Sequence, residues 1–321
     1  MMRRFLAPIP VGRAREHDRV PLSVHRRPMR SRCPLPFAPF LLLLAAAACG
    51  GGAPAEPPLA TPSLTLARSR VALGSPLELT YRFEVQPDAR FDQDYRVFVH
   101  FLDGAGELMW TDDHDPPTPT TQWTPGGTVE YRRTIFLPIY SYVGEATVHL
   151  GLYSPRDGRR VPLAGTDAGL REYRVAALQL LPHTENVFVL RKDGWHGEEA
   201  APENPGVVWH WTKKEATLAF RNPRRESVLY LHGDNPGTYA EPQTLTLTVN
   251  GAPVDTVAIT PRQEFIHRTT LTPEQMGDAD MVEVALTLDR SWVPALVASA
   301  SSRDPRELGI RVFHVFVEPQ S

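Results

Sequence analysis

Apolar and polar residues alternate with a period of two along most of this chain, and this pattern constrains the fold more than any other feature. In the stretch 77–85, Leu77, Leu79, Tyr81, Phe83 and Val85 share one side, while charged or hydroxyl side chains share the other. Such alternation is typical of a half-buried antiparallel strand. The 32 prolines, with only three lysines beside 31 arginines, argue against a long-helix or coiled-coil protein. The sequence therefore predicts an all-β chain.

The alternating segments fall into two series, which predicts two tandem β-sandwich domains. The first series contains strands at 77–85, 95–102, 128–136, 146–153 and 172–178, with turns at Asp103-Gly104 and Asp157-Gly158. About seven short strands in about 120 residues are typical of an immunoglobulin-like sandwich. We assign this sandwich to residues 62–181.

The second series begins near Val187 and is assigned to residues 182–321. Its expected strands cover 216–220, 228–232, 244–249, 254–259, 265–271, 281–288 and 310–317. Asn250-Gly251 predicts a tight hairpin, and the stretch from Thr272 to Gly277 predicts one helical turn, since Pro273 follows a capping threonine. About eight strands with a single short helix favour a jelly-roll-like sandwich.

The N-terminal segment 1–48 has the order of a cleaved signal peptide. Arg30 and Arg32 precede an apolar run over 34–48, which at about 15 residues is shorter than the roughly 20 that a spanning helix needs. Small alanines end the run directly before Cys49. This order resembles a bacterial lipoprotein signal, which implies that Cys49 becomes the lipid-modified first residue. We expect translation to start at Met29, and residues 49–61 to form a flexible tether rich in Gly, Pro and Ala.

Loss of residues 1–48 changes the charge of the chain. That segment holds nine of the 34 basic and two of the 37 acidic residues, so the mature chain carries 25 minus 35, or −10. This sign argues against nucleic-acid partners and against electrostatic adhesion to anionic lipids, so membrane attachment is expected through the lipid. Gly50 stands where an Asp is associated with inner-membrane retention, and we therefore expect the outer membrane, facing the periplasm.

The richest polar stretch of the first predicted domain is Asp112, Asp113, His114 and Asp115. Three carboxylates and an imidazole are ligand types for Ca²⁺ or a transition metal. Neighbouring side chains of an extended segment point in alternating directions, so at most two converge on one point. The alternative is a solvated turn whose aspartates cap backbone amides. On two predicted strands, His100 and His149 form a pair if those strands are neighbours.

The entry of the second predicted domain gathers indoles and carboxylates. Exposed indole faces stack on sugars and carboxylates accept sugar hydroxyl protons, which predicts carbohydrate binding, while the alternative is that the tryptophans plug the sandwich ends. The candidate ligand-binding residues are Trp195, His196, Glu198, Glu199, Trp209 and Trp211. Further along, Arg306 and Glu307 are expected to form an ion pair that braces the last strand.

Both predicted domains resemble modules of bacterial envelope proteins. The second is similar to galactose-binding-like jelly-roll modules, some of them appended to glycosyltransferases or glycan-active enzymes, at Trp195 to Glu199, Trp211-Thr212, Leu247 to Gly251 and Asp304 to Ile310. The first resembles an immunoglobulin-like module at Val97 to Asp103, Asp113-His114, Pro116-Pro117, Pro119-Thr120, Trp123, Pro125-Gly126 and Gly151 to Tyr153. Such modules carry unrelated ligands or none, so the resemblance implies fold rather than activity.

We interpret the chain as a lipid-anchored, non-catalytic envelope protein that binds or scaffolds a glycan or a partner protein. No nucleophile elbow, zinc-protease helix, phosphate loop or dinucleotide fingerprint occurs in the sequence. Two alternatives remain open: a glycan-active hydrolase using the Asp112–Asp115 carboxylates or the pair Glu198 and Glu199, and a purely structural subunit of an envelope complex. No cofactor is expected other than Ca²⁺.

Overall fold

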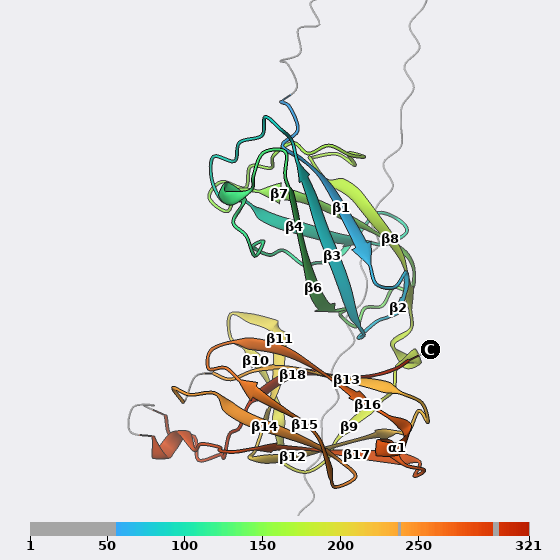
Figure 1. Cartoon of the computed structure of the whole chain (residues 1–321), viewed down its shortest axis with the longest axis vertical. Helices are drawn as coiled ribbons and strands as arrows, with labels where there is room; N and C mark the ends of the chain where they lie inside the picture. The colour runs from blue at the N-terminus through green and yellow to red at the C-terminus, as the bar shows by residue number, and fades with distance from the viewer. Residues whose placement is uncertain (1–55, 237–238, 298–301, 321) are drawn as a thin grey trace, which may run out of the picture. The chain divides into compact units, whose positions relative to one another are not determined.

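Eighteen strands build four sheets in the computed structural model, which describes residues 56–236, 239–297 and 302–320 (Figure 1). The one α-helix in these ranges has four residues, and the all-β prediction is confirmed. Residues 54–321 form one compact unit, and the division into domains at residue 181 stays a prediction. The leader and Cys49 lie outside the described residues.

The first eight strands form a sandwich of a three-stranded and a five-stranded sheet. The smaller sheet has the order β1 (Ala60–Leu66), β3 (Pro76–Val85), β6 (Thr128–Phe136). The larger sheet, called the β7 sheet below, has the order β2 (Arg70–Ala72), β8 (Tyr173–Leu181), β7 (Gly144–Tyr153), β4 (Arg96–Leu102), β5 (Leu108–Thr111). Its immunoglobulin-like character stays a prediction.

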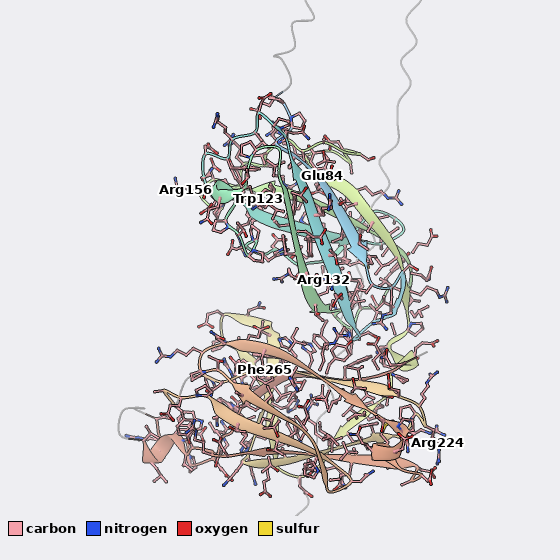
Figure 2. All side chains as sticks on the ribbon, viewed as in Figure 1. Glu84, Trp123, Arg132, Arg156, Arg224 and Phe265 are labelled. Carbon is pink, nitrogen blue, oxygen red and sulfur yellow. The ribbon has the colours of Figure 1, made fainter. Side chains whose placement is uncertain are left out.

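The alternating pattern of the sequence explains how this sandwich closes. In β3 the five residues on the apolar side are all buried, and they face one core shared by both sheets. Trp123 lies in this core, 4.9 Å from Phe83 and 5.3 Å from Phe91 between ring centroids (Figure 2). β1 begins at Ala60, which is fully buried, so the last two residues of the expected tether, Ala60 and Thr61, belong to the first sandwich.

The remaining strands form a second sandwich of two five-stranded sheets around a separate core. The first, called the β18 sheet below, has the order β10 (Trp195–Ala201), β11 (Asn204–Thr212), β18 (Arg311–Pro319), β13 (Ser227–Asp234), β16 (Glu264–Leu271). The other has the order β15 (Ala252–Ile259), β14 (Gln243–Val249), β17 (Met281–Leu288), β12 (Glu215–Arg221), β9 (Val189–Arg191).

Local signals in the sequence set the connections of the second sandwich. Asn250 and Gly251 join β14 to β15 with positive φ angles of 49° and 84°, as a tight hairpin turn of this type requires. Thr272 caps α1 (Pro273–Met276): its side chain accepts from the Gln275 amide, and the Gln275 side chain accepts from the Thr272 amide. The predicted hairpin and helical turn are confirmed. Among the described residues, no helix is both long and apolar enough to cross a membrane.

Candidate ligand-binding site

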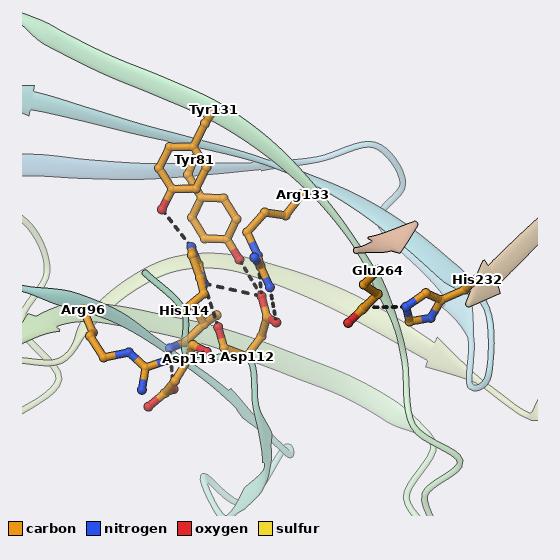
Figure 3. A network of polar contacts seen from close by, with 10 residues as sticks. Tyr81, Arg96, Asp112, Asp113, His114, Tyr131, Arg133, His232 and Glu264 are labelled. Atoms are coloured by element: carbon orange, nitrogen blue, oxygen red, sulfur yellow. Dashed lines mark hydrogen bonds and ion pairs between the residues drawn. The ribbon is translucent and has the colours of Figure 1, made fainter. Parts of the chain in front are cut away.

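Asp112 and His114 enter a buried polar network in the first sandwich, directly after β5 (Figure 3). The Asp112 carboxylate accepts two hydrogen bonds from the Arg133 guanidinium, at 3.0 and 3.3 Å, and one from the Tyr81 hydroxyl at 3.2 Å. His114 Nδ1 lies 2.9 Å from the Asp112 carbonyl oxygen, and Nε2 lies 2.8 Å from the Tyr131 hydroxyl. The alternative of a solvated turn is therefore wrong for these two side chains.

Burial fixes the protonation of this network. It lowers the pKa of His114 and raises the pKa of both Tyr81 and Tyr131. His114 is thus held neutral: Nδ1–H donates to the Asp112 carbonyl, and Nε2 accepts from Tyr131. The network pairs Asp112 with Arg133 and leaves neither His114 nor the tyrosines as a base at pH 7.

Asp113 and Asp115 turn to other partners. Asp113 Oδ1 accepts from the Val99 amide at 3.2 Å, and Asp115 pairs with Arg96 at 3.0 Å. The expectation that at most two of the four side chains converge is confirmed, because Asp112 and His114 share one network and the others do not. Over the described ranges, no group of three or more His, Cys, Asp or Glu side chains is arranged to hold a metal ion.

His100 and His149 lie directly opposite each other on β4 and β7. Their Nδ1 atoms lie 3.2 and 3.5 Å from the two carboxylate oxygens of Glu172, which also accepts from Arg160 at 2.8 Å. The expected pair therefore forms through a shared carboxylate. Arg160 stacks 4.2 Å above the Phe98 ring, so the cluster is closed by its own members.

The candidate tryptophans of the second sandwich are largely buried. Trp195 packs against the main core and donates from Nε1 to the Thr217 carbonyl at 2.9 Å. Trp209 and Trp211 are 9% and 8% exposed and form a separate cluster with Leu308. Trp195 is half-buried, with the Arg191 guanidinium 5.6 Å from its ring centroid. Sugar stacking on Trp209 or Trp211 would need a rearrangement, because protein covers both indoles in this conformation.

The candidate polar residues of β10 are held by partners from the loop before β18. Glu199 accepts from Arg306 at 2.6 Å, and His196 Nε2 lies 2.6 Å from the Glu307 carbonyl oxygen. Arg306 also pairs with Asp304 at 2.7 Å, whereas the Glu307 carboxylate accepts from Ser291. The expected Arg306–Glu307 ion pair is therefore wrong.

Glu198 and Glu199 do not converge. Glu198 is 62% exposed and lies 3.8 Å from His210, whereas Glu199 is directed to Arg306. Successive residues of a strand point to opposite faces, and the two carboxylates follow this rule. The pair does not present two carboxyl groups to one cleft.

A pocket that the sequence did not indicate lies on the β18 sheet, on the face away from the main core. We call it the β18 pocket, with a volume of about 250 Å³. Its lining comes from residues 206–208 of β11, His232 of β13, Glu264 of β16, and Phe313 and His314 of β18.

A β-bulge brings two consecutive residues of β18 into this pocket. His232 is opposite His314 while Gly233 is opposite Val312, so Phe313 is the extra residue of the pair. Val312 and Val317 face the core on either side of the bulge, which leaves both Phe313 and His314 on the outer face. The sequence shows the bulge as a change in the spacing of the core residues. Ile310 and Val312 are two positions apart, as are Val315 and Val317, but three positions separate Val312 from Val315.

The three titratable side chains of the pocket are joined in a line. His232 Nε2 lies 2.5 Å from Glu264 Oε1, and His232 Nδ1 lies 3.0 Å from His314 Nδ1. The hydrogen bond from His232 holds the pKa of Glu264 below its usual range. His314 is partly exposed, yet the protein atoms packed around its ring and the neighbouring His232 lower its pKa to about 4. Phe136 stacks on the His314 ring at 4.4 Å between centroids.

Comparison with known proteins finds likeness in structure only. No protein-family profile matches the chain, and no curated protein matches it. The carbohydrate-binding module CBM36 in complex with calcium and xylotriose matches with 12% identity and a TM-score of 0.24, over 41% of this chain and 98% of that chain. A family 35 carbohydrate-binding module from an environmental isolate matches with 12% identity and a TM-score of 0.25, over 42% and 98%.

The DNA-bound alkylpurine DNA glycosylase AlkC of Pseudomonas fluorescens is also similar in part. It matches with 15% identity and a TM-score of 0.24, over 37% of this chain and 30% of that chain. This chain thus spans less than a third of the length of that protein.

Proposed function

We propose that this chain is a lipid-anchored, non-catalytic binding protein of the bacterial envelope, and that the β18 pocket holds one sugar unit of a glycan. The observation that carries the proposal is the convergence of His232, Glu264 and His314 beside Phe313 in one pocket. An apolar wall with a few placed polar groups is the usual make-up of a small-molecule site. The β18 pocket provides this combination on an outer sheet face.

The size of the pocket limits the ligand. Its volume of about 250 Å³ lies just below the range of roughly 300–1,000 Å³ that is usual for small-molecule sites. One sugar ring is a suitable occupant, because its C–H face packs on an aromatic or aliphatic wall while its hydroxyls donate to carboxylate and imidazole acceptors. Phe313 and Val208 provide the wall, and Glu264 and His314 provide the polar groups.

Binding is favoured over hydrolysis by the placement of the carboxylates. A glycosidase uses two carboxyl groups about 5–10 Å apart across the scissile bond. Among the described residues that line the β18 pocket, Glu264 is the one carboxylate. Asp112 is bound to Arg133, and Glu198 and Glu199 point apart.

Attachment to the envelope is the second part of the proposal. It is supported by the sequence order of arginines, an apolar run, alanines and Cys49. Lipidation at Cys49 would anchor the protein in a membrane, and Gly50 in place of an Asp favours the outer membrane, facing the periplasm. Replacement of Cys49 by Ala should abolish incorporation of labelled fatty acid and move the protein to the soluble periplasmic fraction. Unchanged labelling in this variant would overturn the anchor.

Glycan binding is tested with the full-length protein, purified in mild detergent and applied to a broad glycan array. Val207 lines the pocket and is 41% exposed, so Val207→Arg fills the pocket without removing a core side chain. Val143→Arg, at a residue that is 48% exposed and outside the pocket, is the matched control. We expect binding that is lost in Val207→Arg and kept in Val143→Arg. Absence of binding to any glycan by the folded wild-type protein, or equal binding by both variants, would refute the proposed site.

A further inference from the structure

The titratable side chains of the β18 pocket form a chain of contacts that begins at an ionised carboxylate. Glu264 is ionised at pH 7, since its pKa lies below the usual carboxyl range, and the proton of its 2.5 Å contact therefore belongs to His232 Nε2. On its other side, His232 Nδ1 lies 3.0 Å from His314 Nδ1, so His232 contacts both Glu264 and His314.

Two polar atoms of this chain of contacts remain available to a ligand. Within the described ranges, His314 Nε2 and Glu264 Oε2 make no hydrogen bond to protein. Both residues line the pocket, and the Glu264 side chain is 65% exposed. Glu264 Oε2 therefore offers an ionised acceptor to an occupant, and the pocket suits a ligand group that donates.

Glu264 is the one formal charge that lines the β18 pocket, since no Lys or Arg side chain is among the described residues of the lining. Two arginines act on Glu264 from outside the lining, and each is paired with an aspartate: Arg133 with Asp112 at 3.0 Å and Arg311 with Asp234 at 2.8 Å. Phe313 adds an apolar surface on which a sugar ring can pack, and the Arg311 guanidinium lies 5.8 Å from its ring centroid.

We propose that the β18 pocket selects a sugar with an unsubstituted amine, whose N–H groups donate to Glu264 Oε2 while the sugar ring packs on Phe313. This inference rests on the proposed glycan-binding function and names the ligand class. A protonated amine matches both the acceptor atom and the charge of Glu264, so its hydrogen bond is charge-assisted. An N-acetyl group removes that charge and adds a carbonyl acceptor, and a uronic acid brings a carboxylate against Glu264.

The test measures the affinity of four soluble methyl glycosides for the full-length protein at pH 7, by isothermal titration calorimetry. The four ligands are the glucoside, the glucosaminide, the N-acetylglucosaminide and the glucuronide. We expect the glucosaminide to bind at least about tenfold more tightly than the glucoside, because it gains one charge-assisted hydrogen bond and a gain of that size raises affinity by about this factor. The N-acetylglucosaminide and the glucuronide should bind more weakly than the glucoside.

Glu264→Gln removes the charge and keeps the shape of the side chain. In this variant the glucosaminide should lose its advantage and bind within about twofold of the glucoside. Glu84→Gln is the matched control, because Glu84 is 60% exposed, similar to Glu264 at 65%, and lies in a surface ion pair of the first sandwich. This control should keep the tenfold preference.

The outcomes separate the inference from the proposed function. Equal binding of the glucoside and the glucosaminide overturns amine selection and leaves glycan binding in place. An amine preference that survives in Glu264→Gln overturns the assignment to this pocket. Absence of binding by all four glycosides, together with a blank glycan array, overturns the proposed function itself.

Discussion

Replacement of Asp112 by Asn should destabilise the first sandwich far more than replacement of Asp115 by Asn. Breaking a buried ion pair by removing one partner costs about 3–5 kcal/mol, because a charge stays behind in the protein. The Asp112 side chain is 17% exposed, and that of Arg133 is 35% exposed, so water can solvate part of the abandoned guanidinium. We therefore expect a loss of about 2–3 kcal/mol in the free energy of unfolding.

Asp115 provides the matched comparison in the same loop. Its carboxylate pairs with Arg96 at 3.0 Å but is 79% exposed, and surface ion pairs contribute about 0–1 kcal/mol. Urea unfolding followed by tryptophan fluorescence measures both variants. The free energy of unfolding falls by about 2 kcal/mol per M of urea. Asp112→Asn should therefore lower the midpoint of the transition by about 1 M, and Asp115→Asn by less than about 0.5 M. Equal losses within about 0.5 kcal/mol would refute the structural role of the Asp112 network.

Three further variants test other parts of the fold. The pKa of His314 is lower in the folded chain than in the unfolded chain, so the free energy of unfolding should fall as the pH drops from about 6.5 towards 4. In His314→Asn this fall should be smaller, which denaturation curves taken across that pH range can measure. Thr272→Ala removes the cap of α1 and should cost about 1 kcal/mol in urea unfolding, whereas an unchanged midpoint would argue against the cap. Gly251→Ala places a Cβ at a φ of 84° and should cost about 1–2 kcal/mol, which thermal unfolding can measure; no change would contradict the turn geometry.

Alternation in the sequence predicted the strands that are buried on one face. The segments 128–136 and 281–288 coincide with β6 and β17, and 77–85 differs from β3 by one residue. In these strands the side that faces the core is mostly apolar and the other side mostly polar, so the period of two is visible, with Arg133 of β6 as the exception on the core side. The edge strand β5, with four residues, is too short to show a period.

The strands β10 and β11 escaped prediction for a different reason. Only the second half of β11 is covered on both faces, since His210 is opposite Val312 of the main core while Trp209 and Trp211 pack in the separate cluster on the other face. That half has no exposed polar face, and the first half is exposed, so β11 shows no alternation. The tryptophans were recognised as a feature, but nothing in their spacing distinguishes a covered indole from an exposed one.

The two polar networks depended on pairings that the sequence does not reveal. Asp112 meets Tyr81 and Arg133 because β3 lies beside β6, and these residues are 31 and 21 positions away along the chain. The β18 pocket depends on the extra residue Phe313, which a single strand spanning 310–317 conceals. A search for shifts in the frame of alternation would have located the bulge, although not Glu264, which comes from β16.

Both outward histidine clusters stand next to a β-bulge, and comparing them shows why one of the two is proposed as a ligand site. The register of β7 against β8 shifts between Val148 and His149, and that of β13 against β18 shifts next to His232. In the first cluster the Arg160 guanidinium donates to Glu172 at 2.8 Å and stacks on an aromatic ring, so the carboxylate is neutralised by direct contact. In the second, Arg133 and Arg311 act on Glu264 without a hydrogen bond to it in the described chain, and each is paired with an aspartate. A carboxylate that keeps an unused acceptor oxygen beside a pocket is the one that a donating ligand completes.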